Sequence, residues 1–203
     1  MISKLILEQG TVLLEGPASK GQILSKKMCS GLASFRSPAE QQKALADIAG
    51  LPEGMVYIAH IEEKIIGYIT FHYPDPLERW GQIKIKELLE FGAIEVSPGW
   101  RNKGIAKNLL RIGFSNPVVE DYIIISTEYY WHWDLEGTGL NVWEYKSMIE
   151  CALEEVGFQL VSTDDPEIIS HPANSLMVRY GENVLEKTVI KFESYLFLNK
   201  RMF

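Results

Sequence analysis

The sequence has few cysteines and no long apolar run. Cys29 and Cys151 are its only cysteines, and no CxxC pair is present, so we expect reduced thiols and no disulfide framework. No apolar stretch approaches the roughly 18 to 20 residues that span a bilayer. The apolar residues 5–7 end at Glu8 and are too short for the core of a signal peptide. These absences predict a cytoplasmic protein without a membrane segment.

Positive charge is also scarce. Twenty Lys and Arg residues stand against 27 Asp and Glu residues, a net charge of −7, which argues against a nucleic-acid scaffold held by bulk charge. Hydrophobic residues make up 46% and charged residues 23%, which excludes disorder, collagen and coiled coil. A chain of 203 residues buries roughly 70% of its unfolded surface, so it needs no metal or disulfide to fold.

The hydrophobic pattern predicts an α/β (α+β) fold in which helices alternate with the strands of a mixed sheet. We expect one domain over residues 1–203 with small extensions at both ends. The expected strands are 4–7, 11–14, 55–61, 65–72, 90–96, 122–127 and 157–161. The expected helices are 39–48, 104–113 and 141–155, and 84–89 is compatible with a further one. Residues 184–198 fit a helix, a strand or one of each.

The segment from Ile94 to Ala106 carries the clearest chemical signal. A strand runs into a short loop, and a helix then opens at Gly104. Successive backbone N–H groups and the positive end of a helix suit a phosphate or pyrophosphate. Four basic residues and no acidic one lie between residues 101 and 119, whereas the rest of the chain holds 16 basic and 27 acidic residues. An anionic ligand explains this local excess; the alternative is an ordinary turn with solvated basic residues.

This segment resembles motif A of the GNAT acyltransferase superfamily. The pattern is Val-x-Pro-x-x-Arg-x-x-Gly-Ile-Ala-x-x-Leu-Leu, from Val96 to Leu110. The resemblance implies a single GNAT domain with a mixed, mostly antiparallel central sheet, and acetyl-CoA as cosubstrate. It also implies a slot for pantetheine beside strand 122–127. The residues expected to bind the cosubstrate are Ile94, Val96, Arg101, Asn102, Lys103, Gly104, Ile105 and Ala106.

Four further segments narrow the resemblance, namely residues 47–54, 73–80, 127–135 and 171–174. They are similar to a bacterial branch of the superfamily that serves acetoin utilization. Its members acetylate a lysine of acetyl-CoA synthetase and switch that enzyme off. The resemblance thus implies a protein lysine acetyltransferase with acetyl-CoA synthetase as partner. Two alternatives stay open: a GNAT enzyme for a small amine, and an acyl-CoA sensor that transfers nothing.

Acetyl transfer to lysine requires a neutral amine, and removing its proton at pH 7 costs about 4.6 kcal/mol. A nearby base therefore helps. Glu90, at the start of the motif strand, matches a glutamate that takes this proton in GNAT lysine acetyltransferases. Regular alternation puts Glu90 on the face of Gly92 and Ile94 and puts Glu95, the second candidate, on the opposite face. The alternative for Glu90 is a solvated cap between helix and strand.

Many GNAT enzymes carry a tyrosine as general acid, four residues before the glycine that matches Gly157. That position is Leu153 here, so a tyrosine acid must come from elsewhere. Cys151 is interpreted as a core residue of the same helix, and a cysteine nucleophile is not expected.

An aromatic cluster follows directly on strand 122–127. Successive strand side chains alternate faces, so the cluster cannot all enter one core, and we expect part of it to bind the acceptor. The alternative is packing against Trp143 and Tyr145. No second histidine stands at ligand spacing, so no metal is expected, and His72 and His171 are expected to make structural hydrogen bonds. The cluster residues are Tyr129, Tyr130, Trp131, His132 and Trp133.

Overall fold

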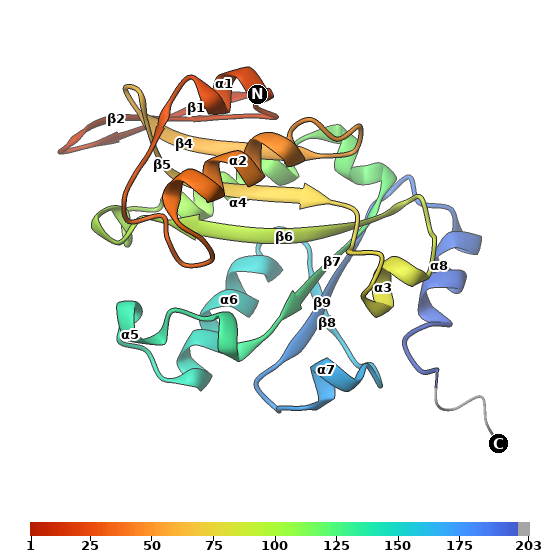
Figure 1. Ribbon diagram of the computed structural model, residues 1–203. Helices are drawn as coiled ribbons and strands as arrows, with labels where there is room; N and C mark the ends of the chain where they lie inside the picture. The colour runs from red at the N-terminus through yellow and green to blue at the C-terminus, as the bar shows by residue number, and fades with distance from the viewer. Residues whose placement is uncertain (199–203) are drawn as a thin grey trace. The chain divides into compact units, whose positions relative to one another are not determined.

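The structure is a computed structural model that describes residues 1–198 (Figure 1). The last five residues of the expected domain, 199–203, lie outside the described part. Two compact units are present. Unit 1 comprises Met1–His72 and Phe91–Asn116, and unit 2 comprises Tyr73–Glu90 and the chain from Pro117 onward. Strand pairing within the units is mixed and mostly antiparallel, as the resemblance implied.

Unit 1 is built on antiparallel hairpins. The predicted hairpin near the N-terminus and the predicted hairpin over 55–72 are both confirmed. A short parallel pairing joins β3 to β5, and the last part of β6 belongs to this unit. The strands are β1 (Ile2–Leu7), β2 (Gly10–Glu15), β3 (Lys27–Met28), β4 (Met55–Ile61), β5 (Lys64–His72) and β6 (Leu88–Val96).

Helices cover both faces of the unit 1 strands. α1 (Lys20–Leu24) and α2 (Pro38–Ile48) bury Ile23 and Leu45 against Ile58 and Tyr68. α4 (Ile105–Phe114) packs on the other face, where its Phe114 ring meets Phe71 edge-on at 5.1 Å. The helices predicted over 39–48 and 104–113 are confirmed within a residue, because a capping box at Ser37 and a glycine at 104 fix their starts.

Unit 2 pairs the start of β6 in parallel with β7 (Ile123–Glu128), which pairs antiparallel with β9 (Ser175–Tyr180). β8 (Gln159–Val161) pairs antiparallel with β9. Residues 123–125 are fully buried on both faces, as their β-branched run predicts. β9 was not predicted, although it is the strand that lies between β7 and β8.

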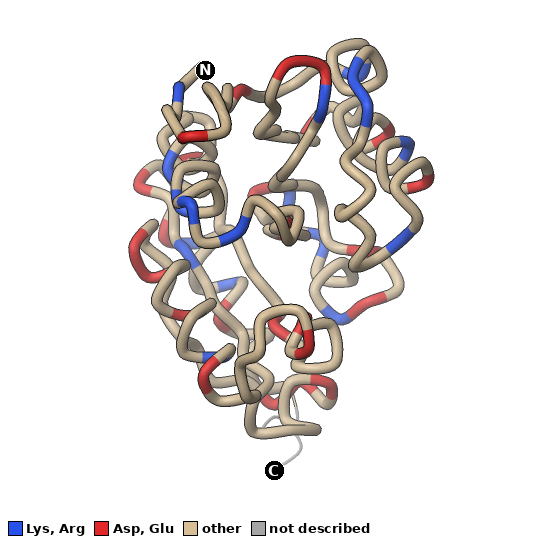
Figure 2. Tube along the Cα trace, turned by 90° about the vertical axis from the view of Figure 1, so that its left-hand side faces the viewer, with Lys and Arg blue, Asp and Glu red and all other residues tan. Residues whose placement is uncertain are grey.

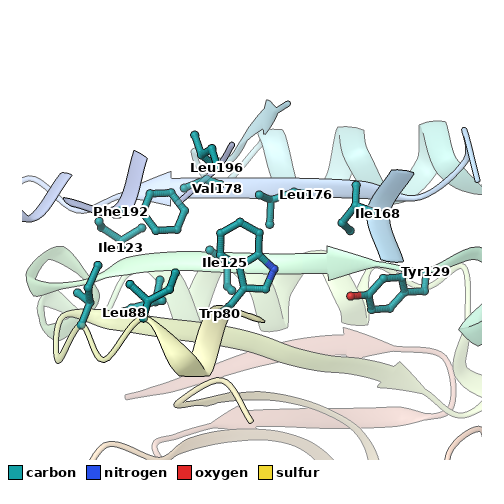
Figure 3. Close-up of a cluster of buried hydrophobic side chains, with 12 residues drawn as sticks. Trp80, Leu88, Ile123, Ile125, Tyr129, Ile168, Leu176, Val178, Phe192 and Leu196 are labelled. Carbon is teal, nitrogen blue, oxygen red and sulfur yellow. The ribbon is translucent and has the colours of Figure 1, made fainter. Parts of the chain in front are cut away.

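Several short helices and two longer ones complete unit 2. They are η2 (Pro117–Asp121), α3 (Arg79–Gln82), η3 (Tyr130–His132), α5 (Leu135–Thr138), α6 (Val142–Glu154), α7 (Pro166–Ile169) and α8 (Glu186–Glu193). The core in Figure 3 gathers Trp80 of α3 and Phe192 of α8 over Ile125 of β7 and Val178 of β9. Within residues 1–198 no helix is long and apolar enough to cross a membrane.

Two predictions for unit 2 were wrong. Residues 84–89 form no helix: Lys84 has φ 52°, while Ile83 and Ile85 both enter the core, and β6 already begins at Leu88. Cys151 is exposed rather than buried. α6 buries Ile149 and Leu153, and a residue midway between two such positions lies on the opposite face of a helix. Residues 184–198, for which the sequence did not decide between helix and strand, contain the helix α8.

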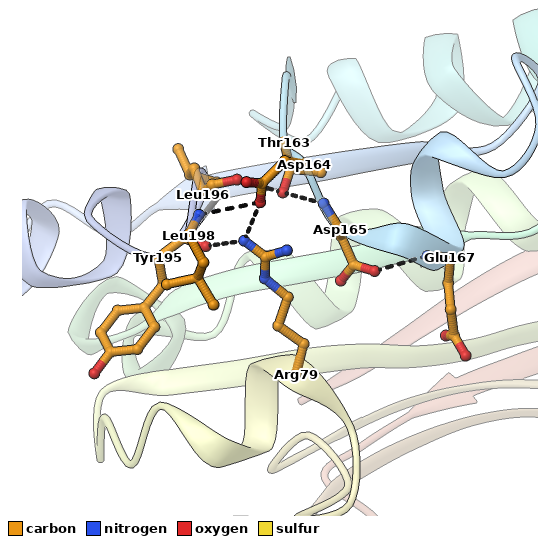
Figure 4. A network of polar contacts seen from close by, with 8 residues as sticks. All are labelled: Arg79, Thr163, Asp164, Asp165, Glu167, Tyr195, Leu196 and Leu198. Atoms are coloured by element: carbon orange, nitrogen blue, oxygen red, sulfur yellow. Dashed lines mark hydrogen bonds and ion pairs between the residues drawn. The ribbon is translucent and has the colours of Figure 1, made fainter. Parts of the chain in front are cut away.

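The end of the described chain is attached to α3 through a polar network (Figure 4). Arg79 forms an ion pair with Asp164 at 2.6 Å and also donates to the carbonyl of Tyr195. Asp164 accepts the backbone N–H of Leu198, and Thr163 donates to the carbonyl of Leu196 at 2.7 Å. These bonds join the β8–α7 loop, α3 and the segment after α8.

Candidate functional site

The loop between β6 and α4 has an unusual backbone. After β6 the chain forms the short 3₁₀ helix η1 (Pro98–Trp100), and α4 then begins at the N-cap Gly104. Asn102 and Gly104 have φ values of 60° and 78°. Both lie in the left-handed region, which costs a side chain with a Cβ strain and costs glycine none. The glycine predicted at the helix start is therefore required by the turn itself.

The N-terminus of α4 is arranged to bind an anion. Gly104 has no side chain to cap the helix, and the first N–H groups of any α-helix have no partner within it. The Asn108 amide instead donates to the Gly104 carbonyl at 2.8 Å and holds the turn. The N–H groups of Ile105 and Ala106 thus lie at the positive end of a ten-residue helix. This geometry suits a phosphate or pyrophosphate.

The basic residues of the loop differ in what they can do. Arg101 is half-buried, and its Nε donates to the carbonyl of Val96 at 3.1 Å, which joins the loop to the end of β6. Lys103 is half-buried and Lys107 is exposed. Elsewhere Lys and Arg residues are mixed with Asp and Glu residues along the trace (Figure 2). Arg101 therefore also shapes the loop, which composition alone does not reveal.

The alternation of side chains along β6 is interrupted within unit 1. Phe91 contacts Phe114 of α4. Val96, five residues later, also lies on the α4 side, where a Cβ at Gly67 would meet both Val96 and Ile105. Residues an odd number apart face opposite ways in a regular strand. Counting alternate residues along β6 therefore does not carry from Phe91 to Val96, and the shared face of Glu90, Gly92 and Ile94 stays a prediction.

Both carboxylate oxygens of Glu95 accept hydrogen bonds within unit 1. Only 4% of it is exposed; one carboxylate oxygen accepts the Tyr68 hydroxyl at 2.6 Å and the other accepts the Ser34 N–H at 2.9 Å. Burial first, and the Glu95 carboxylate second, raise the pKa of Tyr68. Through Ser34, Glu95 thus holds the segment before α2 against β6. The sequence pattern does not signal its second contact, to Tyr68.

Glu90 has a different environment, in unit 2. It is half-buried, and the register pairs it with Ile125 of β7. The Thr127 hydroxyl donates to its Oε1 at 3.3 Å. Apolar residues Leu88 and Ile123 precede this polar pair on the two strands and belong to the core. The carboxylate thus lies where the shared face of β6 and β7 changes from apolar to polar.

Other carboxylates lie near Glu90. The pKa of Glu78 is raised, first by burial and then by the negative charge of Glu90. Smaller contributions come from the charges of Asp75, Glu167 and Asp165. Glu78 and Glu167 are exposed, and Asp165 is buried as the N-cap of α7. An excess of negative charge favours a cationic group such as an ammonium. Sequence reasoning missed Glu78 and Glu167, because they come from separate segments that only the fold brings together.

The aromatic cluster divides at Tyr129. Tyr129 is 9% exposed, belongs to the core of unit 2 and donates its hydroxyl to Glu167 at 3.0 Å. Burial, followed by the hydrogen bond to Glu167, raises the pKa of its hydroxyl. Trp131 stacks on Tyr129 at 4.8 Å and is 50% exposed. Tyr129 therefore connects the core to the exposed ring of Trp131.

The other cluster members extend toward α6. Tyr130 packs on His171 at 4.1 Å, and His171 in turn stacks with Trp143 at 6.4 Å. Trp133 stacks with Tyr145 at 5.0 Å, which matches the packing alternative for that residue. His132 is exposed. The cluster thus combines packed rings with accessible ones.

Two further positions bear on the expected chemistry. Leu153, at the position where the resemblance implied a tyrosine acid, is fully buried and belongs to the core. Within residues 1–198 no three His, Cys, Asp or Glu side chains are grouped to hold a metal ion. Asp134 accepts the Gly137 N–H as the cap of α5.

Comparisons with known proteins agree with the resemblance of the loop between β6 and α4. Residues 26–112 match the model of the Acetyltransferase (GNAT) family. The chain is 46% identical over 200 residues to the acetoin utilization protein AcuA of Bacillus licheniformis, covering 98% of this chain and 95% of that one.

Comparison with solved structures finds proteins with the same fold. The crystal structure of an acetoin utilization protein from Exiguobacterium sibiricum has a TM-score of 0.96 at 44% identity, covering 100% of this chain and 96% of that one. The PaiA N-acetyltransferase of Thermoplasma acidophilum, solved in complex with coenzyme A, has a TM-score of 0.50 at 12% identity, covering 83% and 98% of the two chains. The second likeness concerns the fold alone.

Proposed function

Because the chain belongs to the AcuA family of GNAT acetyltransferases, we propose that it transfers the acetyl group of acetyl-CoA to a protein lysine. We propose acetyl-CoA synthetase as the acceptor protein and the cytoplasm as the compartment, where the free thiols Cys29 and Cys151 would stay reduced. The observation that carries the proposal is the N-terminus of α4, whose backbone N–H groups follow a left-handed glycine.

Acetyl-CoA would bind at this loop mainly through backbone groups. The N–H groups of Gly104, Ile105 and Ala106 would contact the pyrophosphate, with Asn102 and Lys103 beside them. The Arg101 side chain, bonded to Val96, supports the loop conformation. The backbone of Ile94 and Val96 would bind the pantetheine arm, and the N–H near Ile94 would polarise the acetyl carbonyl.

The lysine amine would lose its proton to Glu90. Glu90 is half-buried at the apolar-to-polar change of the β6–β7 face, and exposed carboxylates lie nearby to attract an ammonium. Glu95 is the weaker candidate, since both of its carboxylate oxygens already accept hydrogen bonds and only 4% of it is exposed. The neutral amine would then attack the acetyl carbonyl and displace the CoA thiolate.

The aromatic cluster would contribute the surface on which the acceptor protein docks. Trp131 is half exposed and His132 is exposed. The rings of Tyr129 and Tyr130 pack against Trp131, and the ring of Tyr129 also contacts His132. Large, rigid rings of this kind make good anchors at protein interfaces. Alanine at Trp131 should raise the KM for a protein acceptor and leave the affinity for acetyl-CoA unchanged.

The test incubates the protein with labelled acetyl-CoA and three acceptors in parallel: acetyl-CoA synthetase, a lysine peptide and a polyamine. We expect label on one lysine of acetyl-CoA synthetase and a matching loss of synthetase activity. Label on the polyamine alone would assign the protein to small amines. Binding of acetyl-CoA without transfer to any acceptor would make it a non-catalytic regulator.

A further inference from the structure

A row of ring contacts in unit 2 extends beyond the aromatic cluster. The Tyr130 ring meets the Trp131 ring edge-on at 5.5 Å and packs on His171 at 4.1 Å. His171 in turn stacks with Trp143 of α6 at 6.4 Å. Trp131 and Trp143, at the two ends of this aromatic row, are 50% and 55% exposed. Three separate segments, η3, the residues after α7 and the start of α6, thus present connected rings with an exposed indole at each end.

Hydrogen bonds to the backbone hold the aromatic row in place. The Tyr130 N–H donates to Oδ1 of Asn174, a buried side chain, at 3.1 Å. Nδ1 of His171 accepts the Ala173 N–H at 3.1 Å. The Lys146 ammonium of α6 donates to the Ala173 carbonyl, also at 3.1 Å. Because the rings are ordered before anything binds, a partner does not have to supply the free energy of ordering them.

The part of the chain that carries the aromatic row is strongly acidic. Residues 128–175 contain ten Asp and Glu residues and a single basic residue, Lys146. The Lys146 ammonium already lies 2.8 Å from the Glu150 carboxylate. Glu144, which directly follows the exposed indole of α6, and Glu167 of α7 are both exposed. The exposed rings therefore lie in a region of negative potential.

We propose that the aromatic row, together with the carboxylates of Glu144 and Glu167, binds a basic segment of the acceptor protein in which arginine residues flank the acetylated lysine. The inference rests on the proposed function, in which the aromatic cluster docks the acceptor. An arginine guanidinium stacks on indole rings and also pairs with carboxylates, so this surface recognises it in two ways. The negative potential additionally attracts a basic segment and accelerates its association.

The first test compares three fluorescent peptides that contain one lysine each. The lysine is flanked by arginine, by citrulline, which has nearly the shape of arginine without its charge, or by glutamate. Fluorescence anisotropy measures the Kd of each peptide at low and at high salt. At low salt we expect the arginine peptide to bind about tenfold more tightly than the citrulline peptide, and the glutamate peptide to bind most weakly. The difference should shrink at high salt, because salt screens exposed charges.

The second test removes the far end of the aromatic row. Trp143→Ala should raise the Kd of the arginine peptide about fivefold or more, and Trp143→Tyr, which keeps a ring, should restore most of the affinity. Leu185→Ala truncates a side chain that is 59% exposed before α8, and it should leave the Kd unchanged. A merely structural effect of Trp143→Ala would lower the melting temperature without distinguishing the arginine peptide from the citrulline peptide.

The third test removes the charges. In Glu144→Gln/Glu167→Gln an amide oxygen can still accept the hydrogen bonds that Asn141 and Tyr129 donate to the two carboxylates. We expect the Kd of the arginine peptide to rise about three- to tenfold and that of the citrulline peptide to stay the same. Glu182→Gln/Glu186→Gln removes two exposed carboxylates outside residues 128–175 and is the matched control.

The failures of the two proposals can be told apart, because binding and transfer are measured separately. If the three peptides bind equally while acetyl-CoA synthetase is acetylated, the basic segment is wrong and the proposed function stands. If the arginine peptide binds in a way that depends on Trp143 but no lysine is acetylated, the docking surface stands and the proposed transfer is wrong. Binding of the arginine peptide that neither Trp143→Ala nor Glu144→Gln/Glu167→Gln weakens would overturn the inference, because the peptide would then bind elsewhere.

Discussion

At the scale of single residues, Gly104 gives the most direct prediction. Gly104→Val should lower acetyl-CoA affinity at least tenfold, because a β-branched residue at φ 78° is strained by about 1–3 kcal/mol and shifts the helix start. Gly99→Ala is the matched control, since no atom lies within 4 Å of a Cβ there. Calorimetric titration with acetyl-CoA measures both variants. Equal affinities of the Gly104→Val and Gly99→Ala variants for acetyl-CoA would show that the loop does not bind it.

Glu95 provides a second prediction at this scale. Glu95→Ala should lower the free energy of unfolding by about 2–3 kcal/mol, because it leaves the buried Tyr68 hydroxyl and the Ser34 N–H without their acceptor. Urea unfolding measures this loss. Tyr68→Phe removes the hydroxyl from the same contact, so the loss in a double variant should be less than the sum of the two. A variant of normal stability but with a shifted acidic limb would instead make Glu95 the base.

Glu128 predicts a dependence of stability on pH. Burial raises its pKa above the ordinary value of 4.5, although hydrogen bonds from Ser126 and Trp133 partly oppose this. A raised carboxyl pKa stabilises the fold at low pH, and this contribution is lost as pH rises through the folded pKa. Relative to Glu128→Gln, the wild type should therefore lose unfolding free energy as pH increases. Urea unfolding between pH 5 and pH 9 tests the slope, and parallel curves would contradict it.

At the scale of elements, local signals predicted most of the strands and helices. The hairpins, α2 and α4 carry their own turn glycines, capping residues and periodic apolar positions, so neighbouring residues suffice to identify them. The motif loop was predicted for the same reason. Ile105, Leu109 and Ile112 form the predicted buried stripe of α4.

Elements that depend on distant partners were missed. β9 has four consecutive buried residues, from Ser175 to Val178, and no alternation, because it lies between β7 and β8. The irregularity in β6 is also invisible in the sequence, since the packing of Phe91 against α4 and of Glu95 against Tyr68 decides it. For the candidate site, the loop could be predicted, whereas the partners of Glu90 and Glu95 could not.

The attachment of the segment after α8, up to Leu198, to α3 predicts a stability effect. Arg79→Met should lower the free energy of unfolding by about 2 kcal/mol, because Asp164 and the Tyr195 carbonyl lose a shared, largely buried donor. Amide exchange at Leu198, whose N–H is bound by Asp164, should become faster in the variant. Lys20→Met breaks an exposed pair with Asp47 and serves as the control, with a change below about 1 kcal/mol. Unchanged exchange at Leu198 would show that Arg79 does not hold the segment.

At the scale of the whole molecule, the expectation that residues 1–203 act as one domain stays a prediction. The loop belongs to unit 1, whereas Glu90 and the aromatic cluster belong to unit 2. An acetyltransferase needs the groups of both units in the same folded state. One cooperative unfolding transition would give that coupling, and two separate transitions would exclude a single cooperative domain.

Ligand linkage tests this prediction together with the binding site. Acetyl-CoA at one hundred times its Kd should add about 2.7 kcal/mol to the unfolding free energy. For a chain of this length the melting temperature should then rise by about 5–10 °C. Differential scanning calorimetry should show one peak that moves as a whole, and Gly104→Val should abolish the shift. If only part of the heat absorption moved with acetyl-CoA, the ligand would stabilise one unit alone. The two units would then have to be treated as separate domains that cooperate only during transfer.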